Sequence, residues 1–231
     1  MSKKIIITGG LGYIGTELCK IYSGVSWHHK IIVLDNRFIS ERVNQLRNWN
    51  IEFIHGDILN KDLIRKYCED ADVVHHLAGI TDVPRTKSEV SVEQDKKIKE
   101  VGEQGTQNIL DVISQKCKII FPSTHVVYEG INEVRTNIRE DETTKPVLSY
   151  STSKAINENQ LKESGKNYII LRLGSVYGYS TDSMRIDIMP NLFSKISSQN
   201  GTLKLFASGR QIKSLVPLID VARCFKFMEE K

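Results

Sequence analysis

The sequence predicts an α/β fold built on a doubly wound parallel sheet, for two reasons. Short apolar, β-branched runs recur at residues 4–8, 30–35, 51–56, 72–78, 118–123 and 167–173. Segments of helical length and pattern separate them, at residues 12–23, 40–48, 60–70, 89–115 and 150–165. Continuous apolar strands that alternate with helices are typical of a parallel sheet with both faces covered. Right-handed crossovers then place helices on both faces of the sheet.

The chain after Leu173 has a different composition, with frequent Gly, Ser, Tyr and Asn at residues 174–183. We expect a helix near 187–198, a short strand in "TLKLF" at 202–206 and an amphipathic helix at 219–230. We interpret the chain as a main α/β domain and a small, incomplete second lobe on the carboxyl edge of its sheet, formed by residues 1–173 and 174–231 respectively.

The composition excludes several function classes. The 231 residues carry a net charge of +4, with 40% hydrophobic and 26% charged residues, which are ordinary globular values. Lysines and arginines are scattered, so no nucleic-acid partner is expected. The first apolar run is too short for a signal peptide, and no run approaches the roughly 18 apolar residues of a membrane span. We expect a cytoplasmic protein with no membrane or nucleic-acid contact.

The cysteines and histidines form no metal-binding pattern. The cysteines are far apart and include no C-x-x-C pair, which fits reduced thiols better than zinc or a disulfide framework. The adjacent pair His75 and His76 falls in a strand run, so we expect one ring on each face of the sheet. We predict no metal site. The cysteines concerned are Cys19, Cys68, Cys117 and Cys224.

The stretch "IIITGGLGYIG" is the strongest local signal for a ligand. Its glycines Gly9, Gly12 and Gly15 follow a strand and open a helix, where they allow a tight turn, close approach of a pyrophosphate and close helix–strand packing. Asp35 ends the second strand 20 residues after Gly15, where a carboxylate accepts hydrogen bonds from an adenosine ribose. The pattern predicts dinucleotide binding. A glycine turn beside an ordinary strand-end aspartate is the alternative.

Asp35 also bears on which dinucleotide binds. A carboxylate repels a 2′-phosphate, so it favours NAD over NADP. Arg37 nearby weakens that preference slightly. The other common phosphate loop, G-x-x-x-x-G-K-S/T, is absent from the sequence.

Further motifs follow this loop in a fixed order. With the loop's own "TGGLGYIG", the series is "HGDI" (55–58), "HHLAG" (75–79), "PSTHVVYE", "YSTSK" (150–154), "RLGSVYG" and "GRQIKSLVPLIDVA". An ordered series is far more specific than any one motif. By these stretches the chain resembles the extended short-chain dehydrogenase/reductase family, in its branch of NAD-dependent sugar-nucleotide epimerases and dehydratases, with UDP-glucose 4-epimerase-like features.

The resemblance implies a Rossmann domain that binds NAD. In the family, the aspartate of the G-D-I motif, here Asp57, meets the adenine amino group, and "HHLAG" lies along the cofactor. The cofactor-binding residues that it implies are Gly9, Gly12, Tyr13, Ile14, Gly15, Asp35, Asn36, Asp57, Ile58, Leu77, Ala78, Gly79 and Lys154.

The resemblance also implies a catalytic group of Tyr150, Lys154 and Thr124. Residues four apart lie on one face of a helix, so Lys154 can sit beside Tyr150. A tyrosine with a pKa of about 10 is a poor base, and a nearby ammonium lowers that pKa. Thr124 matches the hydroxyl residue that bonds the substrate oxygen and the tyrosine. The alternative is that Tyr150 is a surface residue, Lys154 a solvated charge and Thr124 a strand-end hydroxyl.

The positions implied for the substrate differ in part from the family pattern. Ser175 replaces an asparagine that commonly touches the sugar-nucleotide phosphate, and Lys213 replaces an arginine that clamps it, which keeps the charge but loses the bidentate fork. Gly102 stands where the family often has asparagine. The substrate-binding residues that we predict are Thr81, Thr124, Ser175 and Lys213.

The residues after Thr124 narrow the reaction. The family's 4,6-dehydratases carry an Asp–Glu pair there as acid and base, and this chain has His125 and Val126. Valine cannot transfer a proton, so we expect a 4-epimerase-like activity on a nucleotide sugar. A reductase or dehydrogenase, a dehydratase and a non-catalytic dinucleotide-binding regulator are the alternatives.

Two expectations concern the whole assembly. Family members pair through their two long helices, so a homodimer is expected. Family members also usually continue beyond "DVA", so we expect either a shortened chain or an open substrate site.

Overall fold

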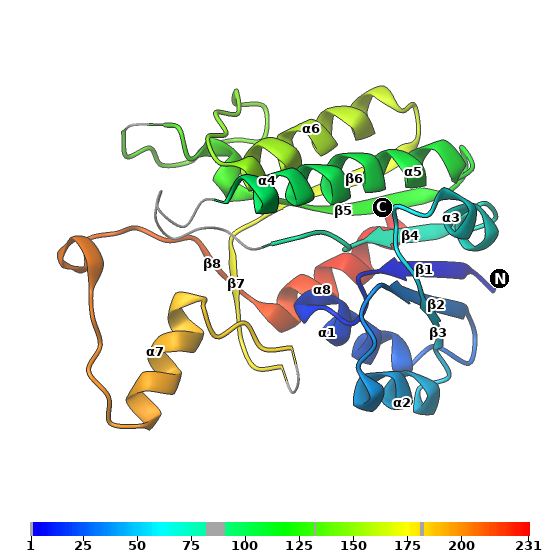
Figure 1. The fold of residues 1–231 in the computed structure, drawn as a ribbon, viewed down its shortest axis with the longest axis horizontal. Helices are drawn as coiled ribbons and strands as arrows, with labels where there is room; N and C mark the ends of the chain where they lie inside the picture. The colour runs from blue at the N-terminus through cyan, green and yellow to red at the C-terminus, as the bar shows by residue number, and fades with distance from the viewer. Residues whose placement is uncertain (1, 82–90, 132, 181–182) are drawn as a thin grey trace.

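The computed structural model describes residues 2–81, 91–131, 133–180 and 183–231. Its large sheet has the strand order β3-β2-β1-β4-β5-β6, and every neighbouring pair is parallel (Figure 1). This is the strand order of a doubly wound dinucleotide-binding fold, so the predicted fold class is confirmed. The strands are β1 (Lys4–Thr8), β2 (Lys30–Asp35), β3 (Glu52–His55), β4 (Val73–His76), β5 (Lys118–Thr124) and β6 (Asn167–Leu173).

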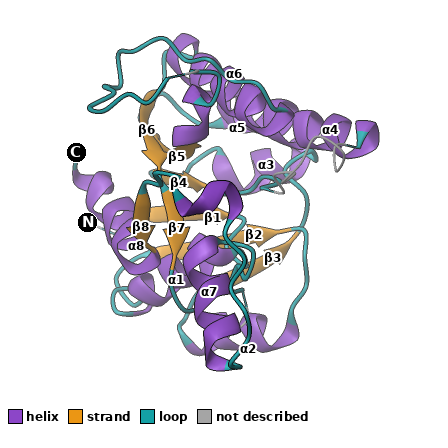
Figure 2. Cartoon of the chain, turned by 90° about the vertical axis from the view of Figure 1, so that its left-hand side faces the viewer, coloured by secondary structure: helices purple, strands orange, loops and turns teal. Residues whose placement is uncertain are grey.

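Helices cover both faces of this sheet (Figure 2). A one-turn π-helical segment, Glu100–Gln104, joins α4 to α5. The helix predicted at 89–115 therefore forms in three parts, and its first two residues lie outside the described residues. The helices are α1 (Tyr13–Ser23), α2 (Ser40–Asn48), α3 (Lys61–Cys68), α4 (Val92–Lys99), α5 (Gly105–Val112), α6 (Ser149–Glu163), α7 (Met189–Ser198) and α8 (Leu218–Phe227).

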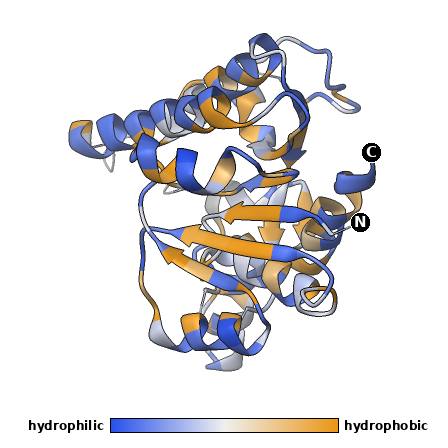
Figure 3. Cartoon of the chain, turned by 90° about the vertical axis from the view of Figure 1, so that its right-hand side faces the viewer, coloured by the Kyte–Doolittle hydropathy of each residue, from blue (hydrophilic) through white to orange (hydrophobic). Residues whose placement is uncertain are grey.

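The alternation of side chains along β1 separates two hydrophobic cores. Ile5 and Ile7 pack on one face with residues of α1, α2 and α8, whereas Ile6 packs on the other with residues of α3, α5 and α6. A strand buried on both faces needs apolar side chains in both directions, which explains its uninterrupted isoleucine run. Figure 3 shows apolar residues gathered on the strands and polar residues on the outer turns of the helices.

The two histidines of β4 are buried on opposite faces of the sheet, as expected. His75 contacts Tyr22 and Glu229, with its Nε2 2.6 Å from the Tyr22 hydroxyl and 3.1 Å from the Glu229 carboxylate. His76 lies between two threonine hydroxyls, 2.9 Å from Thr8 and 3.0 Å from Thr106. Both rings therefore connect the sheet to the elements that cover it.

The strand predicted at 202–206 is wrong. Residues 201–205 form a loop that leads into a 3-10 turn at Phe206–Gly209, and the Leu205 side chain is 61% exposed. Within the described residues, no strand pairs with this stretch to take up its backbone hydrogen bonds. A small parallel pair forms elsewhere instead, between β7 (Ser175–Tyr177) and β8 (Leu215–Pro217).

The last helix belongs to the core of the main sheet. Val221, Ala222 and Phe225 of α8 are buried with β1 and α1 in one hydrophobic cluster, and α8 lies beside α1 in Figure 1. Helix α7 and the loop after it extend away from the sheet in the same view. The division of the chain after residue 173 stays a prediction.

His76 gives a testable link between the fold and pH. Burial, and then the positive charge of Lys154, lowers the pKa of His76 to about 3. As pH falls from 6.5 towards 3, the unfolded chain binds a proton there that the folded chain does not, so stability falls by about 1.4 kcal/mol per pH unit.

We therefore expect His76→Gln to reduce the acid-induced loss of stability. Between pH 7.5 and 5, the free energy of unfolding of the variant, measured in urea, should fall about 2 kcal/mol less than that of the parent. Equal losses in the two proteins would contradict a neutral, buried His76.

Candidate active site

A cavity of about 960 Å³ lies at the carboxyl edge of the large sheet and contains all the predicted site residues. It runs from the glycine loop after β1, past the ends of β4 and β5, to β7 and the segment before α7. Ligands of open α/β sheets bind at this edge, where the strand order reverses. The predicted residues that line it are Gly9, Gly12, Tyr13, Ile14, Gly15, Asp35, Asn36, Asp57, Ile58, Leu77, Ala78, Gly79, Thr81, Thr124, Tyr150, Lys154, Ser175 and Lys213.

The glycine loop has the geometry of a phosphate-binding turn. Gly9 has a φ of +69°, and a Cβ there would lie 2.7 Å from the Ala78 amide nitrogen. A Cβ on Gly15 would lie 2.5 Å from the Gly9 carbonyl oxygen. Both positions thus require glycine, and the turn brings the first N–H groups of α1 to the cavity, where they lack intrahelical acceptors. These groups fit a pyrophosphate.

Asp35 is buried at the end of β2, where its carboxylate binds the backbone of the glycine loop. Its carboxylate accepts hydrogen bonds from the Leu11 amide at 2.9 Å and the Arg37 amide at 3.0 Å, and Arg37 Nε lies 3.3 Å away. One acid therefore fixes the glycine loop and faces the same cavity. This geometry fits an adenosine ribose bound at Asp35.

The residues that follow β3 line another part of the cavity. Asp57 accepts a hydrogen bond from Asn36 Nδ2 at 2.9 Å, and the Leu59 amide caps its other oxygen at 2.9 Å. The His55 ring lies 3.0 Å from the Asn36 carbonyl oxygen. These bonds hold Asp57 at the cavity wall, and its contact with an adenine amino group stays a prediction.

Lys154 lies on α6 and lines the cavity. Its Nζ donates to the Pro122 carbonyl at 2.8 Å and sits 4.2 Å from the centre of the Phe121 ring. Burial lowers the pKa of Lys154 to about 7, and the charge of Glu158 opposes that shift. Small changes in the surroundings of Lys154 can therefore change its protonation near neutral pH.

Tyr150 lies one turn earlier on α6 and lines the same cavity. Burial raises the pKa of its phenol and outweighs the charge of Arg185 and a hydrogen bond with Thr124, which lower it. The lowering of the tyrosine pKa expected from Lys154 is therefore not found in the structure. The Thr124 hydroxyl also accepts from the Val126 amide at 3.3 Å, which holds it at the end of β5. The structure therefore brings together the three predicted catalytic residues.

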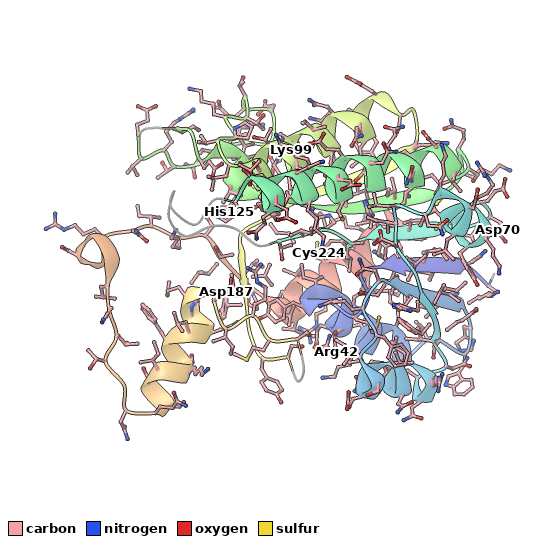
Figure 4. All side chains as sticks on the ribbon, viewed as in Figure 1. Arg42, Asp70, Lys99, His125, Asp187 and Cys224 are labelled. Atoms are coloured by element: carbon pink, nitrogen blue, oxygen red, sulfur yellow. The ribbon has the colours of Figure 1, made fainter. Side chains whose placement is uncertain are left out.

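Some residues that line the cavity are not among the predicted site residues. Arg185 and Asp187, between β7 and α7, form an ion pair with Nη2 2.7 Å from the carboxylate. His125 donates its Nδ1 proton to the Leu173 carbonyl at 3.0 Å, which leaves Nε2 as the nitrogen available to a ligand. Figure 4 labels His125 and Asp187. No motif surrounds the arginine, so only its fold position reveals it.

The π-helical segment gives Gly102 a structural reason. A Cβ there would lie 2.3 Å from the Ser153 hydroxyl oxygen, and the Gly102 carbonyl accepts from Asn157 Nδ2 at 3.0 Å. The family's asparagine would collide with α6 unless Ser153 moved. Glycine at position 102 therefore lets this segment pack closely against α6.

No group of three or more His, Cys, Asp or Glu side chains in the described residues is arranged to hold a metal ion. None of the helices described is both long and apolar enough to cross a membrane.

Residues 5–231 match the model of the NAD dependent epimerase/dehydratase family, so the chain belongs to that family. The match confirms the resemblance in the motifs and the predicted cofactor, NAD. The residues described above fit that cofactor, from the glycine loop and Asp35 at its adenosine half to Lys154 at the other end of the cavity.

Curated relatives cover several reactions. The chain is 27% identical to a dTDP-D-glucose 4,6-dehydratase of Dictyostelium discoideum, over 99% of this chain and 56% of the relative. It is 29% identical to a UDP-N-acetyl-alpha-D-glucosaminuronate decarboxylase of Bacillus cytotoxicus, over 100% and 73%. It is 30% identical to a CDP-paratose 2-epimerase of Salmonella typhi, over 76% and 58%. The chain thus spans about half to three quarters of these relatives.

A solved structure with a bound nucleotide sugar and NAD has the same fold as this chain. A UDP-glucuronic acid 4-epimerase from Bacillus cereus, in complex with UDP-glucuronic acid and NAD, superposes with a TM-score of 0.80 at 26% identity. The match covers 99% of this chain and 73% of that one.

The glycine loop yields a prediction with a matched control. Gly9→Ala and Gly165→Ala both place a side chain at a positive φ, of +69° and +67°, but only Gly9 faces backbone atoms closer than 3 Å. We expect Gly165→Ala to cost about 1 kcal/mol of stability and to leave NAD binding unchanged. Gly9→Ala should cost about 3 kcal/mol or more and weaken NAD binding at least about tenfold.

Urea unfolding and calorimetric titration with NAD measure these effects. Equal NAD affinity in the two glycine variants would contradict the placement of the cofactor over Gly9.

Proposed function

We propose that this chain is an NAD-dependent sugar-nucleotide epimerase that acts by reversible hydride transfer at C4 of the sugar. One observation carries the proposal. Tyr150, Lys154 and Thr124 meet in the same cavity as the dinucleotide loop, while His125 and Val126 occupy the places of the dehydratase acid pair. The relatives and solved neighbours that act on nucleotide sugars support the substrate class.

The chain's own groups have distinct roles in this reaction. NAD, when bound, accepts the hydride and returns it. Tyr150 takes the proton of the sugar hydroxyl as the hydride leaves the same carbon, and the Lys154 ammonium favours the phenolate that does so. Thr124 holds the phenol and the sugar oxygen in line. The hydride would return to the opposite face of the ketone carbon, and Tyr150 would give its proton back to the ketone oxygen to complete the epimerisation.

The part of the cavity near β7 and the segment before α7 suits the diphosphate of a nucleotide sugar. Lys213 and Arg185 line it and supply positive charge, and Ser175 and Thr81 offer hydroxyl groups. Asp187 pairs with Arg185 and orients its guanidinium. Binding energy from the diphosphate positions the distant sugar carbon for reaction.

Three further features belong to this proposal. We infer that residues 1–173 form the NAD-binding domain, with α8 packed against it, and that the part of residues 174–231 that precedes α8 contributes to a substrate lobe. The protein acts as a homodimer in the cytoplasm, through the two long helices before and at the Tyr–Lys motif.

A reductase or dehydrogenase of the same family is the second candidate. Lys213 and Ser175 differ from the family's phosphate-binding pattern, which favours a different substrate. Such an enzyme would accumulate or consume NADH with each turnover, whereas an epimerase regenerates its cofactor.

The test is turnover of UDP-glucose, UDP-glucuronic acid and UDP-N-acetylglucosamine with NAD, followed by nuclear magnetic resonance of the sugar products. We expect the C4 epimer of at least one, with no net NADH. Tyr150→Phe should lower the rate by about 100-fold or more because it removes the acid/base group.

The matched control is Tyr179→Phe, at a phenol that is 74% exposed. It should keep full activity, and both variants should bind NAD like the parent. No epimer from any of the three sugars, with NAD bound, would rule out this epimerase assignment for them.

A further inference from the structure

A buried carboxylate lies behind the catalytic pair and outside the cavity lining. Glu158 is 2% exposed and follows Lys154 by four residues on α6, as Lys154 follows Tyr150. Residues four apart share one helix face, so the three side chains form a row from the cavity into the protein. Burying a carboxylate is costly unless it is paired and hydrogen-bonded, so its partners indicate its use.

The hydrogen-bond donors to the Glu158 carboxylate come from β5 and β6, the two strands beneath α6. The Ser123 hydroxyl donates to Glu158 Oε1 at 2.5 Å. The Arg172 guanidinium donates twice, from Nε to Oε1 at 2.9 Å and from Nη2 to Oε2 at 2.6 Å. Lys162 Nζ lies 3.7 Å from the same carboxylate. The bonds to Arg172 and Ser123 overcome the effect of burial and lower the pKa of Glu158, so it carries its negative charge at neutral pH.

The network reaches the catalytic residues through the backbone. Ser123 precedes Thr124 on β5, and it pairs in register with Arg172 on β6. Lys154 Nζ bonds to the carbonyl of Pro122, the residue before Ser123. Glu158 thus ties α6 to the strand end that carries Thr124.

We propose that Glu158 is a positioning residue of the active site, whose carboxylate supplies the negative charge that keeps Lys154 an ammonium. It also holds the end of β5 so that Thr124 stays in reach of Tyr150. Its role in catalysis rests on the proposed function, but its effect on Lys154 does not depend on turnover.

The electrostatic need for such a charge is clear from the surroundings of Lys154. Burial brings the pKa of Lys154 to about 7, and Glu158 is the group that raises it. A neutral amine would no longer stabilise a Tyr150 phenolate. Of the other ionisable groups, His76 on β4 interacts with the charge of Lys154, and Arg185 with Tyr150. Arg172 on β6 and Lys162 on α6 pair with Glu158.

The test is a titration of Lys154 by nuclear magnetic resonance of 13C-labelled lysine, with Lys154→Arg to assign the signal. In Glu158→Gln, which keeps hydrogen-bonding atoms but loses the charge, we expect the pKa of Lys154 to fall by about one unit. The alkaline limit of activity should move down by a similar amount.

Two controls separate charge from structure. Ser123→Ala removes a hydrogen bond but keeps the carboxylate, and Glu163→Gln removes an exposed carboxylate of the same helix. Both should leave the titration of Lys154 unchanged. If Glu158→Gln leaves it unchanged too, the proposal is overturned, even where activity is lost.

A second variant covers the case in which Glu158→Gln does not fold. Glu158→Gln with Arg172→Gln removes both charges of the pair and leaves no unpaired guanidinium buried. The pKa of Lys154 should again fall, but by less than in Glu158→Gln, because loss of the Arg172 charge favours the ammonium. An unchanged value would overturn the proposal. Absence of epimerase activity in the parent would refute the proposed function without altering this titration.

Discussion

All six strands of the large sheet run parallel, and that single constraint places the site. Their carboxyl ends meet at one edge, so the glycine loop after β1, Asp35 after β2 and Thr124 at the end of β5 share one cavity although they are far apart in sequence. The helix dipole and free N–H groups of α1 face that edge as well. The site is therefore a consequence of strand direction, and the side chains specialise it.

Charged side chains also lie beside that edge, where removing them from water costs free energy. Lys154, Glu158 and Arg172 alternate in sign from α6 to β6, with Glu158 buried and Lys154 and Arg172 partly buried. Isolated, any of them would be destabilising, but together they hold the catalytic helix against β5 and β6. The arrangement links the stability of the fold to the protonation of the pair that carries the proposed chemistry.

The fold was predictable because its signals are local: β-branched runs, glycines at a turn and an aspartate at a strand end. The strand expected at 202–206 failed because its alternating apolar residues have no partner strand among the described residues. Arg185, Asp187 and Glu158 escaped detection because tertiary packing alone brings them to the site or behind it. His125 was noticed only as a departure from a pattern.

The central claim is that one dinucleotide spans the cavity from Asp35 to the Tyr150–Lys154 pair. A crystal structure of the protein with NAD tests it most directly. We predict the adenosine ribose within hydrogen-bond distance of the Asp35 carboxylate, and the nicotinamide ribose within that distance of Lys154 Nζ, with Tyr150 beside the nicotinamide ring. NAD bound with its nicotinamide turned away from Tyr150, or bound outside this cavity, would contradict the account.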